Sequence, residues 1–213
     1  MRPGTASRIT DITNYKWKDD TWMKNRENFD PDTGAMSIYE VHPGSWMKHP
    51  QTAEDEDGFY SYRELAPKLA QYVKKMGYTH VELMGIAEHP YDGSWGYQNT
   101  GFFAPTSRYG TPAQLKMLID KLHHAGIGAI MDFVPVHFAV DSYGLAKYDG
   151  THLYEYPHSA VGESEWGSYN FIHSRREVRC FLQSAADYWL TEFHFDGLRM
   201  DCLLYTSPSP RDA

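Results

Sequence analysis

The 213-residue sequence has little cysteine and no excess of basic residues, and each shortage excludes a class of protein. Its two cysteines, Cys180 and Cys202, have neither the paired spacing of a zinc site nor the density of a disulfide scaffold. The chain has 20 Lys and Arg against 28 Asp and Glu, which gives a net charge of −8. We therefore expect no nucleic-acid partner, because such proteins concentrate positive charge on one face.

Long hydrophobic runs are also missing. No apolar run is long enough to span a bilayer, and residues 1–5 lack the apolar core of a signal peptide. These absences predict a cytoplasmic protein without a membrane partner. The eleven His include no His-Glu-x-x-His motif, and no glycine-rich phosphate motif follows a predicted strand.

What is present is a globular composition rich in aromatic residues. Apolar side chains make up 41% of the chain, enough for about one domain with a core. Aromatic residues reach 15%, with sixteen Tyr and six Trp, which suits a site that stacks on sugar rings. Ordinary packing in a core and on a surface accounts for the same composition, and composition alone favours that explanation.

From residue 36 onward the sequence alternates between strand and helix patterns. A capping pattern at Ser61-x-x-Glu64 precedes the first helix, but Pro67 lies inside it, so we expect the regular helix only from near Ala66. Residues 135–173 read as an elaborated loop. The predicted strands are 37–42, 79–84, 127–134 and 195–201, and the other helices begin at Thr111-Pro112 and near Val178.

This order of elements predicts an α/β fold with a parallel sheet and right-handed crossovers. The run at 127–134 is almost continuously apolar, as a parallel strand covered on both faces requires. Because no phosphate-binding motif is present, half of a (β/α)₈ barrel fits better than a nucleotide-binding sheet.

The last predicted strand carries the strongest chemical signal. Arg199 and Asp201 are two residues apart, so on a strand they project from the same side, and the guanidinium favours the ionised carboxylate. An ionised Asp at the carboxyl end of a barrel strand is a potential nucleophile. The alternative is a structural ion pair, and the two residues alone do not decide between them.

Two further segments could take part in chemistry. Asp132 ends the third predicted strand and His137 follows it, so both belong near the same barrel mouth as Asp201. Alternatively, each only satisfies local contacts. The segment 88–98 follows the second strand and combines Gly turns with polar and aromatic side chains, as a sugar-binding loop or a packed surface loop would.

Six ordered blocks of sequence carry a family resemblance. They are YEVHPGSW at 39–46, ELM at 82–84, EHPYDGSWGYQ at 88–98, APTSRYGTP at 104–112, DFVPVHF at 132–138 and DGLRMD at 196–201. With them, residues 2 to 201 resemble the prokaryotic glycogen branching enzymes of the α-amylase superfamily. The resemblance implies cleavage of an α-1,4 bond through a covalent intermediate on Asp201, followed by transfer of the chain to a 6-hydroxyl of an α-glucan.

The resemblance also assigns roles to other residues. Arg199 becomes the electrostatic partner of the nucleophile, and the residues expected to bind substrate are Tyr97, Asp132, His137, Asp92, Trp95 and Gln98. We expect no cofactor and no metal. Calcium-binding amylases carry an Asn before the loop His, whereas this chain has Val136, which offers no oxygen ligand. Ile172 also stands where many relatives have Asn, so that loop is expected to differ.

The resemblance divides the chain into three parts. Residues 1–35 are expected to be the end of an amino-terminal β-sandwich module and a linker, and residues 36–201 the first half of the catalytic barrel. Residues 202–213 resemble one reading frame of a sequencing-library adapter, so we expect them not to be native. The acid/base Glu that a retaining mechanism needs would then lie beyond the break, and we expect the isolated polypeptide to be inactive and poorly folded.

Two other functions remain open at this point. A hydrolase of the same superfamily, such as a trehalose-releasing or debranching enzyme, would use the same nucleophile. A non-catalytic glucan-binding protein could retain the barrel mouth as a groove. A Glu at the end of the following strand of the uninterrupted gene would argue against the binding protein.

Overall fold

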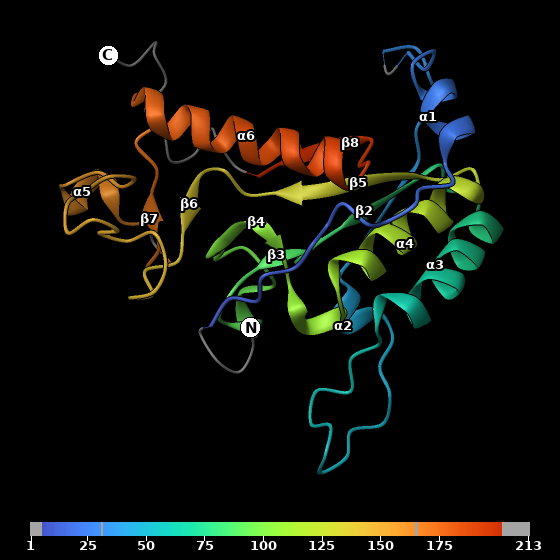
Figure 1. The fold of residues 1–213 in the computed structure, drawn as a ribbon, viewed down its shortest axis with the longest axis horizontal. Coiled ribbons are helices and arrows are strands. Elements are labelled where there is room, and N and C mark those ends of the chain that lie inside the picture. The colour runs from blue at the N-terminus through green and yellow to red at the C-terminus, as the bar shows by residue number, and fades with distance from the viewer. Residues whose placement is uncertain (1–5, 31, 165, 202–213) are drawn as a thin grey trace.

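The protein contains a four-stranded parallel sheet. The computed structural model describes residues 6–30, 32–164 and 166–201 (Figure 1). The strands are β1 (Ile38–Val41), β2 (His80–Leu83), β5 (Gly128–Phe133) and β8 (Gly197–Met200), and they lie side by side in that order. All three pairings are parallel. The four predicted strands and their parallel arrangement are therefore confirmed.

Three long helices alternate with these strands, as predicted. They are α3 (Tyr62–Met76), α4 (Pro112–His124) and α6 (Arg176–Glu192). Figure 1 shows α3 and α4 side by side below the strands, with α6 along the upper side. Every residue of β5 is buried, which confirms the prediction of a strand covered on both faces.

The predicted start of α3 near Ala66 is wrong, because the helix begins at Tyr62. The Ser61 hydroxyl accepts from the Glu64 amide, and Glu64 Oε2 accepts from the Ser61 amide at 2.9 Å. These two bonds satisfy backbone amides at the start of the helix that would otherwise lack a partner. Tyr62 is completely buried, which also holds the first turn against the core. These contacts outweigh the single backbone hydrogen bond that Pro67 cannot donate.

Short elements follow the carboxyl ends of the parallel strands. The antiparallel pair β3 (Ala87–Glu88) and β4 (Gly101–Pro105) follows β2, and α2 (Pro43–Trp46) follows β1. The stretch 135–173 is mostly irregular, as predicted, but it also contains α5 (Ser159–Gly162) and the antiparallel pair β6 (His137–Phe138) and β7 (Tyr169–Asn170). Figure 1 shows α5, β6 and β7 together beyond the tip of β5.

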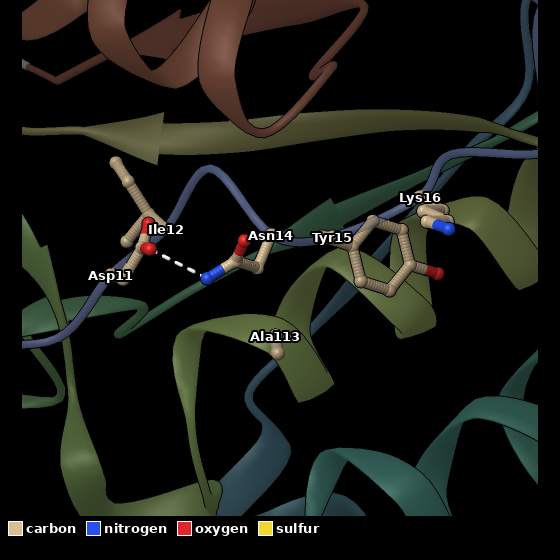
Figure 2. Close-up of a pocket in the computed structure, with 6 residues that line it drawn as sticks. All are labelled: Asp11, Ile12, Asn14, Tyr15, Lys16 and Ala113. Carbon is tan, nitrogen blue, oxygen red and sulfur yellow. Dashed lines mark hydrogen bonds between the residues drawn. The ribbon is translucent and has the colours of Figure 1, made fainter.

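The amino-terminal segment is bound to the sheet and its helices. It runs in extended form past α4 and ends in α1 (Asp20–Arg26), at the end of the strands opposite β6 and β7 (Figure 1). A pocket of about 330 Å³ lies between residues 11–16 and Ala113 at the start of α4 (Figure 2). Tyr15 donates to Asp120 Oδ2 at 3.0 Å, which ties the segment to α4.

The part of the chain expected to be non-native, residues 202–213, lies outside the described residues. Within the described ranges, none of the helices combines the length and the apolar character needed to cross a bilayer.

Candidate active site

The carboxyl ends of β5 and β8 bring together one arginine and two aspartates. Arg199 Nη1 donates to Asp132 Oδ1 at 2.9 Å and to Asp201 Oδ1 at 2.5 Å. The Asp201 amide donates to the Phe133 carbonyl at 3.0 Å, so the pairing of the two strands continues to the residue expected to be the nucleophile. The expectation that Arg199 and Asp201 project from the same side is confirmed.

Arg199 also lies near a third carboxylate that the sequence did not single out. Its Nε is 4.0 Å from Glu82 Oε1 on β2. Burial raises the pKa of Glu82 above its usual range, and the charge of Asp132 raises it further. Burial opposes the charge of Arg199, but the carboxylates of Asp132 and Asp201 raise the pKa of Arg199 above its ordinary value. The sequence did contain a signal for Glu82. It is a charged residue inside a predicted strand, in a block that already resembles the family.

Tyr97 and Asp132 form a second contact at the same mouth. Burial and a hydrogen bond to Asp132 raise the pKa of Tyr97 well above its ordinary value, so the phenol keeps its proton at neutral pH. Burial raises the pKa of Asp132, although the hydrogen bonds from Tyr97 and Arg199 oppose this shift. The structure thus brings together Tyr97, Asp132, Arg199 and Asp201, which the sequence predicted to share one site.

His137 reaches the mouth from β6. Its Nδ1 forms a short hydrogen bond with Ser168 Oγ, and its ring centroid lies 6.2 Å from that of Trp166. Burial lowers the pKa of His137, and the charge of Asp201 only partly opposes this, so the neutral imidazole is favoured at neutral pH. Neither Ser168 nor Trp166 had a signal in the sequence, because both come from the far end of a long irregular loop.

The three other predicted residues lie on the loop that carries Tyr97. Trp95 is 61% exposed and has a left-handed backbone, with φ of 54°. Gln98 Nε2 donates to the Trp166 carbonyl at 3.1 Å, which connects this loop to that of His137. The Asp92 carboxylate instead accepts from Arg108 Nε at 2.6 Å.

Gly96 is required beside Tyr97, and Gly96→Ala should destabilise the protein more than Gly77→Ala. Both glycines have positive φ, 90° and 82°, so both substitutions carry the backbone cost, about 1 kcal/mol. Only at Gly96 would the new Cβ meet backbone, 2.3 Å from the Gly85 Cα, whereas nothing lies within 4 Å at Gly77. Midpoints of urea unfolding would measure both costs, and equal midpoints would contradict the close approach.

The comparisons with known proteins agree with this geometry. The family model for the α-amylase catalytic domain matches residues 54–151. A 1,4-alpha-glucan branching enzyme from Butyrivibrio fibrisolvens is 50% identical over 216 residues, a match that covers 100% of this chain and 34% of the relative. Over its whole length, the chain matches part of a 1,4-alpha-glucan branching enzyme. Branching enzymes from Corynebacterium diphtheriae and Aquifex aeolicus are 53% and 52% identical, with 95% and 94% of this chain and 26% and 31% of the relatives covered.

Two solved structures share the fold of this chain. A putative α-amylase from Salmonella typhimurium matches with a TM-score of 0.72 and 27% identity, over 95% of this chain and 31% of that one. An α-amylase from Geobacillus thermoleovorans, complexed with acarbose, has a TM-score of 0.62 and 23% identity, over 78% of this chain and 40% of that one. The expected α/β fold, part of an α-amylase barrel, is confirmed. The chain spans about a third of the length of the first relative.

Proposed function

We propose that the protein containing this chain is a 1,4-α-glucan branching enzyme with Asp201 as its nucleophile. The observation that carries the proposal is the position of Asp201 at the end of β8, where Arg199 bridges it to Asp132. An anionic oxygen at the mouth of a barrel, next to a fixed cation, is suited to attack an electron-poor sugar carbon.

In the proposed reaction, an Asp201 oxygen attacks C1 of a glucosyl residue and the bond from C1 to the O4 of the next sugar breaks. A second carboxyl group protonates the departing O4. The 6-hydroxyl oxygen of an acceptor glucan then attacks C1 and releases Asp201, while its proton returns to the second carboxyl group. We expect the second carboxyl group in the part of the relatives' sequences that this chain does not match.

The remaining predicted residues are proposed to hold the sugar. Asp132 can accept from sugar hydroxyls, and the Tyr97 phenol and the neutral His137 imidazole can each donate or accept. The exposed indole of Trp95 offers an apolar face to a sugar ring, and Gln98 joins the two loops around it.

The division into an amino-terminal segment and a half-barrel remains part of the proposal. In the described residues β1 and β8 are the two edges of the parallel sheet. A cavity of about 990 Å³ borders the sheet and is lined by residues that include Ile38, Glu82, Ile130 and Arg199. We propose that further barrel strands fill this side in the complete enzyme, that its substrate is a cytoplasmic α-glucan, and that it acts without a nucleic-acid or membrane partner.

Reducing ends distinguish a branching enzyme from a hydrolase. With a linear α-1,4-glucan, the complete enzyme should increase α-1,6 branch points while the number of reducing ends stays nearly constant, because each cleaved chain is transferred to another sugar. Branch points and reducing ends would be measured in the same reaction. A parallel rise in reducing ends would favour the hydrolase, and binding without either change would favour the non-catalytic glucan-binding protein.

A further inference from the structure

We propose that Arg108 is a positioning residue, which fixes the loop of Tyr97 through its ion pair with Asp92. The inference rests on the proposed function, because it assigns the ion pair an effect on turnover. It also changes the expected role of Asp92, from a contact with substrate to an anchor of the loop.

The Arg108 guanidinium is buried and held between two carboxylates. Its side chain is 1% exposed, Nη1 donates to Glu88 Oε1 at 2.7 Å, and Nε donates to Asp92 Oδ1 at 2.6 Å. Two different nitrogens of the planar guanidinium therefore bind Glu88 and Asp92, which both lie in the segment that leads to Tyr97. A lysine offers one compact ammonium group on a flexible stem and cannot reproduce this fork.

The Glu88 side of this arrangement is fixed independently of Asp92. Glu88 Oε2 accepts from the Ser107 amide at 3.1 Å, and Glu88 Oε1 accepts from the Thr106 hydroxyl at 3.1 Å. Thr106 Oγ1 also accepts from Arg108 Nη1 at 3.1 Å. Because these bonds hold the guanidinium in one orientation, its Nε has a defined position at which to hold Asp92.

From Asp92, short-range backbone bonds lead directly to Tyr97. The Trp95 amide donates to the Asp92 carbonyl at 3.0 Å, and the Tyr97 amide donates to the Ser94 carbonyl at 2.9 Å. Gly96, between them, lies against the backbone of Gly85. A segment with successive tight turns moves as a unit, so a displacement of Asp92 shifts the Tyr97 hydroxyl away from Asp132.

Exposure separates this positioning effect from stability. The Asp92 side chain is 42% exposed, so water already solvates its carboxylate in the folded protein. The buried Arg108 keeps its ion pair with Glu88 when Asp92 is replaced, so the loss of the Asp92 pair should change the free energy of unfolding little. Misplacement of a group that contacts substrate by about 1 Å can still cost a large factor in rate. The Arg108–Asp92 pair should therefore affect kcat more than it affects folding.

A double-mutant cycle in the complete enzyme tests the proposal. Asp92→Asn is expected to lower kcat for branching about tenfold, with little change in the unfolding midpoint. Tyr97→Phe removes the hydroxyl and should lower kcat at least as much. The double variant should be no slower than Tyr97→Phe alone, because without the hydroxyl there is nothing left for Asp92 to position.

Two further variants serve as controls. Asp187→Asn removes an exposed carboxylate on α6 and should leave kcat unchanged. Arg108→Lys should also lower kcat, whereas Arg63→Lys, at an exposed site of α3, should not. Multiplicative losses in the double variant, or a normal kcat for Asp92→Asn, would overturn the positioning role. Failure of the proposed function is recognised separately, by normal branching in Asp201→Asn.

Discussion

Replacing Asp201 by Asn in the complete enzyme should lower kcat for branching by roughly ten-thousandfold. The Asn side chain is a neutral amide without an anionic oxygen to attack C1, so the covalent intermediate cannot form. Folding should change little, because the Asn amide oxygen can still accept from Arg199, which also keeps its bond to Asp132. The measurement is the initial rate of branch formation at a saturating concentration of a linear glucan.

The matched control is Asp187→Asn, which removes the same charge from an exposed face of α6. It should keep full activity. A slowly reacting fluorinated glycosyl donor should label Asp201 in the unmodified enzyme, and peptide mapping would locate the label. Near-normal turnover in Asp201→Asn, or a label on another residue, would show that the nucleophile has been assigned wrongly.

His123→Ala should lower the free energy of unfolding by about 3–5 kcal/mol. The His123 side chain is completely buried, with Nδ1 2.8 Å from Asp19 Oδ2 and Nε2 3.0 Å from Asp196 Oδ2. Both nitrogens lie within hydrogen-bonding distance of carboxylates, so the ring bridges two acidic side chains in the buried interior. Its removal leaves the two carboxylates close together without their shared hydrogen-bond partner. Urea unfolding at neutral pH measures the loss.

His124→Ala is the neighbouring control. The His124 side chain is 51% exposed and pairs with Asp120 at 3.4 Å on the helix surface, so its removal should cost less than about 1 kcal/mol. Equal costs for the two histidines would contradict a bridging role for His123.

The pH dependence provides a second check on the same bridge. Burial opposes the charge of Asp196 and of Asp19, but hydrogen bonds outweigh it and lower the pKa of both carboxyls. At Asp196 the largest of these bonds comes from His123, and at Asp19 the bond from His194 comes first and that from His123 second. A lowered pKa contributes stability that is complete above the unfolded value of about 4 and is lost as the pH falls through the folded value. The unmodified protein should therefore lose more stability on acidification than His123→Ala does.

This bridge shows what the sequence could not predict about the first 35 residues. Their turn-rich, polar composition indicates a linker, yet Asp19 is buried and His194 also contacts it at 2.9 Å. Trp22 Nε1 and Arg26 Nη1 bind Asp196 Oδ1 at 2.8 and 3.1 Å. These partners lie about 170 residues apart in the chain, and no local pattern marks one as the partner of the other.

The sequence by itself determined the main strands and helices and the positions of Arg199 and Asp201 on the last strand. Hydrophobic periodicity and capping residues depend on neighbours within about four positions, so β5, α4 and α6 could be predicted, and the spacing of Arg199 and Asp201 placed both on one side of a strand. Even the start of α3, which was predicted wrongly, depends on local residues. Pro67 disfavours helix before it, and the capping box at Ser61 favours it.

Only the tertiary structure decided how the site is held. Glu82, Asp132 and Asp201 share Arg199 because three separate strands end at one mouth, and Asp92 binds Arg108 because β3 and β4 pair. Such contacts follow from strand pairing and from the burial of charge, which depend on residues distant in the chain. Local sequence therefore specified which groups the site contains, and long-range packing specified which of them meet.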